Sequence, residues 1–331
     1  MTLTEQSRKK IAKLYQGRKH VELTIGTLKG GKIETIHWGP DMKQKNDEVL
    51  VYPVGSICKP FTTAMLAKYV SEGKLDLDAP LSEYIQPLPE QYYPSLRKLA
   101  THSSGYAGTP HSTWTAIKLL ARMNKPNGIL RVNPYHGIDG DDMMRILAEK
   151  PMKDQEYPFA YSNFGMGVLG YIVGAISGLG FWDGLQEYIR QDLGLANTSL
   201  GNTDMIGYDK KDQPCNCWPW DKSDMAAPAG ALLSSVEDLL CFAKQQMDGS
   251  KPYLELCHQV HGAGEKGKDF DSGLAWRIKK GTGISYHGGN AGAYSAFLCM
   301  DRQKQTAAVV AINYGLVDDV EPLGFSLLEG L

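Results

Sequence analysis

Short apolar runs typical of strands occur near both ends of the chain, and apolar residues at helical spacing occupy much of the middle. The runs at residues 21–27 and 32–38 predict two strands, and the Gly30–Gly31 pair between them predicts a hairpin. Four further strands are predicted near the C-terminus, at residues 273–279, 283–287, 293–300 and 306–313. Strands at both ends around a helical middle indicate an antiparallel sheet assembled from N-terminal and C-terminal parts of the chain.

Helices are predicted where apolar residues recur at helical spacing, at residues 3–16, after residue 59, and at 236–247 and 321–331. Residues 164–179 form the longest apolar-rich segment, and five glycines interrupt it. That glycine density predicts helices packed closely against their neighbours.

These elements predict an α/β (α+β) protein. Its sheet domain is discontinuous, at residues 1–76 and 226–331, and a mainly helical domain, residues 77–225, is inserted. A chain of 331 residues, 42% of them hydrophobic, is long enough for two such domains. The net charge of −2 gives no reason to expect nucleic acid or an anionic membrane as a partner. No apolar stretch approaches the length of a membrane span.

The first ten residues lack the charged-then-apolar pattern of a secretion signal. This predicts a cytoplasmic protein, or an exported one if a leader has been removed. Six scattered cysteines fit reduced thiols better than a disulfide framework. The sequence leaves the oligomeric state open.

The candidate chemistry begins with Ser56 and Lys59. A lysine three residues after a serine lies on the same face of a helix. Its amine can take the serine's proton if burial or a neighbouring cation lowers the lysine pKa. The apolar run that follows predicts a buried helix, whose free N–H groups favour an oxyanion at its start.

Other serines have the same spacing to a lysine, Ser7 and Ser95 among them. Ser7 lies in a charged stretch typical of a solvated helix face, and Ser95 lies where a helix cap is expected. Ser56 differs because Tyr161-Ser162-Asn163, the only Tyr-x-Asn of the chain, and then His287-Gly288-Gly289 follow it in order.

With these three motifs the chain resembles the serine β-lactamase and penicillin-binding protein family, which includes class C β-lactamases, D-Ala-D-Ala carboxypeptidases and related esterases. The resemblance extends from about residue 20 to about residue 315, and four further segments support it: residues 72–81, 99–105, 193–199 and 228–239. It implies a β-lactamase/transpeptidase-like fold, in which helices flank an antiparallel sheet and the active site lies in the cleft between the two domains.

The resemblance also implies roles for individual residues. Ser56 is the acyl-accepting nucleophile, and either Lys59 or Tyr161 is the general base. A phenol ordinarily titrates near pH 10, so a phenolate at Tyr161 needs positive charge nearby. Asn163 is expected to hydrogen-bond Lys59 and the substrate's acyl amide.

A second group of residues is expected along the strand that lines the cleft. His287, Gly288 and Gly289 open this strand, and Gly289 lets its backbone approach the substrate. The amide N–H groups of Ser56 and Asn290 are expected to form the oxyanion hole. β-Lactamases usually carry lysine at the position of His287; a mostly neutral histidine predicts weak penicillin hydrolysis.

Three weaker features have competing interpretations. Cys215-x-Cys217 and the later Cys257, His258 and His261 match no common zinc spacing, so neither a metal nor a cofactor is expected. His102 is interpreted as a structural histidine. The aromatic pair in Trp218-Pro219-Trp220 is expected to be a substrate wall or a hydrophobic plug.

The resulting hypothesis is a serine hydrolase that forms an acyl-enzyme on Ser56 and cleaves an amide bond, with a peptide containing D-amino acids as the first expectation. The alternative is a carboxylesterase or acyltransferase acting on a small ester or natural product. A non-catalytic, assembly-forming homologue is the third hypothesis, and the intact Ser56, Lys59 and Tyr161 argue against it. In each catalytic case the partner is a small-molecule or peptide substrate.

Overall fold

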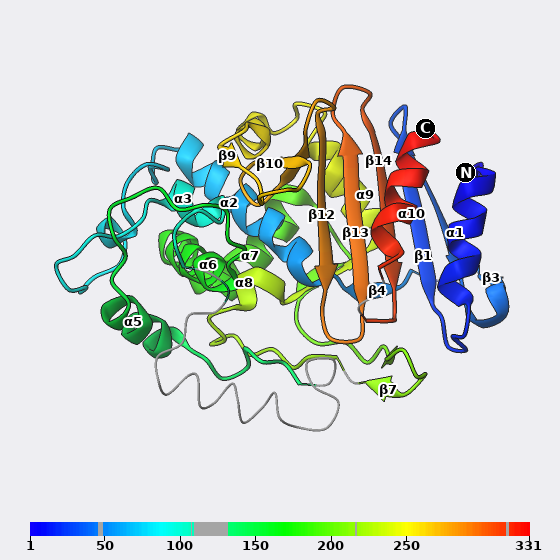
Figure 1. Ribbon diagram of the computed structural model, residues 1–331, viewed down its shortest axis with the longest axis horizontal. Helices are drawn as coiled ribbons and strands as arrows, with labels where there is room; N and C mark the ends of the chain where they lie inside the picture. Colours follow the sequence, from blue (N-terminus) through cyan, green and yellow to red (C-terminus); the bar gives the residue numbers. More distant parts are fainter. Residues whose placement is uncertain (46–48, 107, 109–131, 216, 316–317) are drawn as a thin grey trace.

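A nine-stranded antiparallel sheet is the centre of the computed structural model, which describes residues 1–45, 49–106, 108, 132–215, 217–315 and 318–331. Its strands run in the order β3-β2-β1-β14-β13-β12-β11-β10-β9. Their bounds are β1 (Leu23–Lys29), β2 (Lys32–Trp38), β3 (Gln44–Lys45), β9 (Gly262–Ala263), β10 (Phe270–Ser272), β11 (Arg277–Lys279), β12 (Ile284–Asn290), β13 (Ser295–Asp301) and β14 (Thr306–Ile312). The pairing of β1 with β14 joins the two ends of the chain, which confirms the predicted sheet (Figure 1).

One predicted strand, at residues 273–279, is wrong in its extent. The structure has two short strands there, β10 and β11, joined by a tight turn. Gly273 N–H donates to the Trp276 carbonyl (2.8 Å), and Ala275 adopts a left-handed backbone with φ of 57°. The turn lets Trp276 bury its large side chain in the core. Strand propensity does not predict such a turn.

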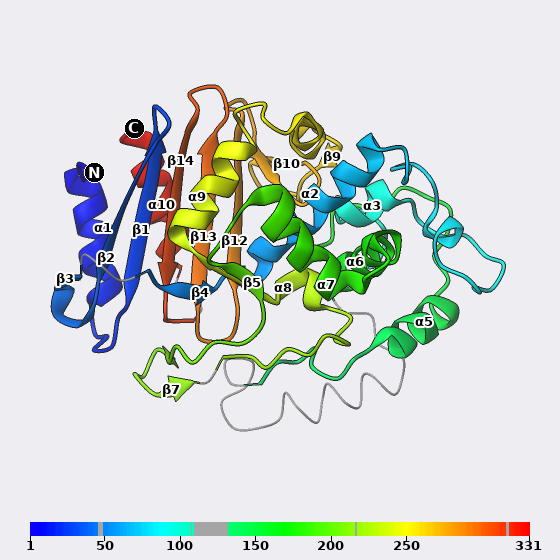
Figure 2. The ribbon, with the colours of Figure 1, turned by 180° about the vertical axis from the view of Figure 1, so that it is seen from behind.

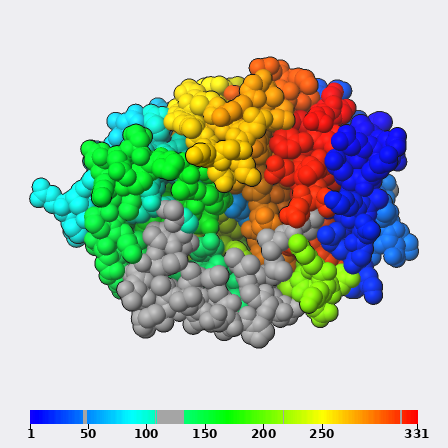
Figure 3. Space-filling model, viewed as in Figure 1, coloured from blue at the N-terminus to red at the C-terminus, as the bar shows by residue number. Residues whose placement is uncertain are grey.

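Helices cover both faces of this sheet. α1 (Glu5–Tyr15) and α10 (Val320–Glu329) lie over one face, and α9 (Val236–Gln245) lies over the opposite face, as Figures 1 and 2 show. Every residue of β13 and β14 is buried as a result. In Figure 3 the blue N-terminal and red C-terminal segments lie side by side at one end of the molecule, and cyan and green segments lie at the other.

Helix α2 (Cys58–Ser71) is buried along most of its length. Five further α-helices are described in this part of the chain: α3 (Leu96–Ala100), α5 (Gly140–Glu149), α6 (Asn163–Ser177), α7 (Gly180–Glu187) and α8 (Ala227–Gly230). Of these, α6, α7 and α8 pack against α2. A Cβ on Gly170 would lie 2.0 Å from a side-chain atom of Pro228, so the glycines of α6 do allow close packing. In the described part of the chain no single helix is long and apolar enough to span a membrane; α6 and Gly180–Leu193 pass that test only as a pair bent by 70°.

A second, three-stranded sheet lies beside the start of α2. Its order is β4-β8-β5, with β4 (Val51–Pro53), β8 (Leu232–Ser235) and β5 (Thr198–Leu200). These strands come from all three segments of the predicted division, 1–76, 226–331 and 77–225. The domain boundaries stay a prediction, and residues 109–131 of the inserted segment lie outside the described residues.

The rest of the described secondary structure is short. β6 (Gly207–Tyr208) pairs with β7 (Pro214–Cys215). The 3-10 turns are η1 (Pro40–Met42), η2 (Gly55–Ile57), η3 (Leu81–Glu83) and η6 (Pro252–His258), and η5 (Tyr188–Leu193) is a π-helical segment. Of these, η2 matters for the site because it carries Ser56.

Candidate active site

Ser56 lies in the tight turn between strand β4 and helix α2. Its neighbour Gly55 has a φ of 52°, in the left-handed region that glycine adopts without strain. A Cβ on Gly55 would lie 2.5 Å from the Asn290 carbonyl oxygen, so a side chain there would push β12 away. The half-buried Ser56 hydroxyl is therefore held at the N-terminal end of a buried helix and against the end of β12.

Lys59 is fully buried one helical turn later. Its Nζ donates to Ser56 Oγ (2.9 Å) and to the Ala229 carbonyl oxygen (2.8 Å). Burial lowers the pKa of Lys59 to about 7, and the positive charge of Arg277 acts in the same direction. A large share of Lys59 is thus a free amine at neutral pH, in hydrogen-bond reach of the hydroxyl that it would deprotonate.

Tyr161 is the third residue of this group and lies close to Lys59. Lys59 Nζ is 4.7 Å from the centre of the Tyr161 ring. Burial raises the pKa of Tyr161 to about 12, although a hydrogen bond with Ser56 and the charge of Arg277 act in the opposite direction. Tyr161 is therefore a neutral phenol at pH 7, a state that suits proton relay better than the role of a phenolate base.

The segment that carries Tyr161 is held by His102. His102 Nδ1 accepts the backbone N–H of Ser162 (3.2 Å), and the His102 carbonyl accepts the N–H of Ala160 (2.7 Å). Burial lowers the pKa of His102 to about 3, so the imidazole is neutral. These contacts agree with the interpretation of His102 as a structural residue.

Asn163 lies beside Ser56 but makes a different contact from the expected one. Its Nδ2 donates to the hydroxyl oxygen of Tyr135 (2.7 Å). Its Oδ1 is buried without a hydrogen-bond partner among the described residues. The expected bond between Asn163 and Lys59 is therefore not formed; the Lys59 amine donates to Ser56 and Ala229.

The end of β12 approaches the nucleophile through its backbone. A Cβ on Gly289 would lie 1.9 Å from the Val54 carbonyl oxygen and 3.1 Å from the Ser56 nitrogen. Only glycine allows this approach, which brings the Asn290 peptide against Gly55. The arrangement suits the predicted oxyanion hole at the Ser56 and Asn290 amides, and that role stays a prediction.

His287 is 3% exposed and follows Tyr286 on β12. Its Nδ1–H donates to the Gly288 carbonyl oxygen (2.7 Å), which fixes the orientation of the ring. Burial, with the charge of Arg277 second, places the pKa of His287 well below its usual range. The imidazole is therefore neutral, as expected, but it does not line the cavity at Ser56, and the predicted contact with substrate stays a prediction.

Arg277 is a residue that sequence analysis missed. It lies on β11, directly opposite Tyr286 in the sheet. Its positive charge lowers the pKa of Lys59, Tyr161 and His287 alike. The register of β11 against β12 creates this proximity, and no sequence motif signals it.

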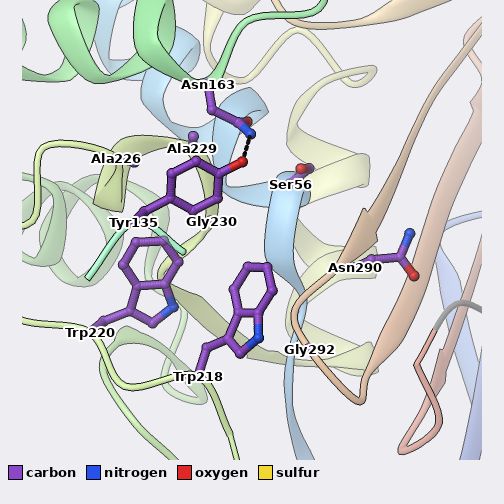
Figure 4. Close-up of a pocket in the computed structure, with 10 residues that line it drawn as sticks. All are labelled: Ser56, Tyr135, Asn163, Trp218, Trp220, Ala226, Ala229, Gly230, Asn290 and Gly292. Atoms are coloured by element: carbon purple, nitrogen blue, oxygen red, sulfur yellow. Dashed lines mark hydrogen bonds between the residues drawn. The ribbon is translucent and has the colours of Figure 1, made fainter. Parts of the chain in front are cut away.

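A cavity of about 190 Å³ opens above Ser56. Figure 4 shows Tyr135, Trp218 and Trp220 together on one side, with Ser56 facing them and Asn290 on the other side. The Tyr135 and Trp220 rings are parallel, and their centres are 6.4 Å apart. The described lining carries no charged side chain: Ser56, Tyr135, Asn163, Trp218, Trp220, Ala226, Ala229, Gly230, Asn290 and Gly292. The tryptophan pair is thus a wall of the cavity.

Comparison with known proteins identifies the family to which this chain belongs. The sequence model of the family described as Beta-lactamase matches residues 8–323. The chain belongs to the β-lactamase family.

Individual relatives agree with this assignment. Protein flp of Staphylococcus aureus (strain NCTC 8325 / PS 47) is 24% identical over 295 residues, which are 82% of this chain and 55% of the relative. The chain thus spans about half the length of that curated relative. A class C β-lactamase from Rhodobacter sphaeroides has a TM-score of 0.77 at 18% identity, covering 99% of both chains. The β-lactamase/D-alanine carboxypeptidase from Pseudomonas syringae has a TM-score of 0.77 at 17% identity, covering 98% of both. These likenesses confirm the β-lactamase/transpeptidase-like fold.

Proposed function

We propose that this β-lactamase-family protein is a carboxylesterase that forms an acyl-enzyme on Ser56 from neutral esters with an apolar or aromatic acyl group. The observation that carries the proposal is the cavity lining opposite Ser56, which is aromatic on one side and uncharged throughout its described extent. A carboxylate in such a cavity would lose hydration without gaining an ion pair, whereas an apolar acyl chain gains burial.

In this reaction Lys59, as the free amine, takes the proton of Ser56 while the hydroxyl oxygen attacks the ester carbonyl carbon. Negative charge moves to the carbonyl oxygen, where the N–H groups of Ser56 and Asn290 stabilise it. The intermediate collapses, the bond to the alcohol breaks, and the leaving oxygen receives the proton through the neutral Tyr161 phenol. Water then attacks the acyl-enzyme by the same proton transfers and releases the acid.

The proposal is tested by steady-state hydrolysis of p-nitrophenyl butanoate and p-nitrophenyl 3-phenylpropanoate. The natural protein should hydrolyse both, and Ser56→Ala should lose this activity. Ser95→Ala is the matched control, since Ser95 has the same spacing to a lysine but caps α3 by accepting the Lys98 N–H. Absence of turnover of either ester by the natural protein would overturn the esterase proposal.

A second candidate is cleavage of an amide bond in a peptide with D-amino acids. Arg277 favours it, because a cation that lowers the pKa of Lys59 and Tyr161 also attracts the carboxylate of a peptide C-terminus. The P. syringae neighbour described as a β-lactamase/D-alanine carboxypeptidase adds support through its fold. The discriminating measurement is kcat/KM for a peptide ending in D-alanyl-D-alanine against kcat/KM for p-nitrophenyl butanoate; a higher value for the peptide would favour this candidate.

A further inference from the structure

The aromatic wall of the cavity is built from two loops that are far apart in the sequence. Tyr135 lies in the loop of residues 132–139, and Trp218 and Trp220 lie in the loop of residues 217–226. Figure 4 shows the three rings together, and their centres are 6.3 or 6.4 Å from one another. The shape of the wall therefore depends on how the two loops are held relative to each other.

A buried carboxylate joins these loops. The side chain of Asp224 has no exposed surface. Its Oδ1 accepts the backbone N–H of Gly137 in the first loop (2.5 Å), and its Oδ2 accepts the N–H of Asp221 in its own loop (2.8 Å). His136 Nδ1 lies 3.1 Å from the same Oδ2. Two backbone N–H groups and an imidazole thus compensate a charge whose burial would otherwise be costly.

Two further contacts join the same loops. The Met225 N–H donates to the Ile138 carbonyl oxygen (2.8 Å). Asn133, which is 1% exposed, accepts the Tyr135 N–H at its Oδ1 (3.0 Å) and donates from its Nδ2 to the Pro219 carbonyl oxygen (2.8 Å). Asn133 thereby links the backbone of Tyr135 to the residue between the two tryptophans.

Asp224 is not among the described residues that line the cavity, so it can act on a substrate only through the wall. We propose that Asp224 is a positioning residue, whose carboxylate holds the two loops together and so gives the site its selectivity for aromatic acyl groups. A wall that is already in place binds an aryl group without the cost of ordering two loops. This inference rests on the proposed esterase function and names a residue that sets its acyl selectivity.

The test compares p-nitrophenyl 3-phenylpropanoate with p-nitrophenyl acetate. The first acyl group carries a ring that can contact the wall, whereas the acetyl group ends at one methyl. The selectivity is kcat/KM for the phenylpropanoate divided by kcat/KM for the acetate. Each variant is compared with the natural protein, which cancels the difference in intrinsic reactivity between the two esters, and its melting temperature is measured.

Asp224→Ala should lower the selectivity about three- to tenfold, the effect of losing one aromatic contact, and should leave kcat/KM for the acetate within about twofold. Asn133→Ala removes the second side-chain link and should change the selectivity in the same direction; it supplies the test if Asp224→Ala does not fold. The matched control is Asp238→Ala. Asp238 is also buried, and its Oδ2 accepts the Asn197 N–H (2.7 Å) and the Thr198 hydroxyl (2.8 Å). It joins α9 to the start of β5, away from the described lining, so its loss should lower the melting temperature but not the selectivity.

Two results would overturn the inference. A selectivity that stays unchanged in both Asp224→Ala and Asn133→Ala would show that these links support only the fold. A selectivity that falls as far in Asp238→Ala would show that any loosening of the protein produces the effect. If the natural protein turns over neither ester, the proposed function fails; if it turns over both and the variants keep its selectivity, only the role of Asp224 fails.

Discussion

The burial of Lys59 determines how ester hydrolysis should vary with pH. An exposed lysine has a pKa near 10.5, and burial without an acidic partner lowers the pKa of Lys59 to about 7. At pH 7 about half of such lysines are free amines, against about 0.03% for the exposed residue. Burial therefore raises the fraction of competent base on the order of a thousandfold.

The expected profile follows from this pKa. Lysine acts as a base only when deprotonated, so kcat/KM falls as pH decreases through about 7. It should reach about 10% of its plateau at pH 6 and about 90% at pH 8. Tyr161 should not contribute in this range, because its pKa is raised to about 12.

The assay is kcat/KM for p-nitrophenyl butanoate between pH 5 and 9, after subtraction of the reaction with hydroxide. A neutral ester has no ionisation of its own, so the profile reports groups of the free enzyme. Tyr161→Phe should be slower but keep the midpoint near pH 7. A rate that still rises tenfold per pH unit at pH 9, or a midpoint that disappears in Tyr161→Phe, would refute Lys59 as the base.

Three further predictions concern other parts of the site. Lys59→Ala and Tyr161→Phe should each lower kcat about 100-fold or more, with strongly non-additive effects because both residues act on one proton; losses that multiply in the double variant would contradict this. Arg277→Gln should raise the pKa of Lys59 and move the midpoint of the profile to higher pH, whereas Lys279→Gln, on the same strand, should leave it in place; equal midpoints in all three proteins would exclude the influence of Arg277. Gly289→Ala should lower the melting temperature by about 5 °C or more, since its Cβ would meet the Val54 carbonyl at 1.9 Å, while in Gly288→Ala the nearest atom is 3.7 Å away; similar melting temperatures would show that β12 can move aside.

The sequence predicts the framework of the fold well because long elements carry clear patterns. β1, β2, β12, β13 and β14 each have seven residues, and each overlaps a predicted strand. The strands β4, β5 and β8 have three or four residues and no pattern of their own. Their pairing depends on where larger elements bring them, which explains why the second sheet was not predicted.

Sequence analysis likewise finds some contacts of the candidate site and misses others. The contact between Ser56 and Lys59 follows from their spacing on one helix, and sequence analysis finds it. The contacts of Lys59 with Ala229, and of Asn163 with Tyr135, join residues 170 and 28 positions apart. Such contacts arise from packing between helices and loops, and so the bond of Asn163 to Tyr135 could not be anticipated.

The central claim is that Ser56 becomes acylated, and mass spectrometry tests it most directly. The natural protein is mixed with p-nitrophenyl 3-phenylpropanoate, quenched in acid within the first turnovers, digested and analysed for the acyl mass. The account predicts the added acyl group on Ser56, and its absence from the Ser56→Ala protein treated in the same way. An acyl group on any other residue, with Ser56 unmodified, would contradict the account.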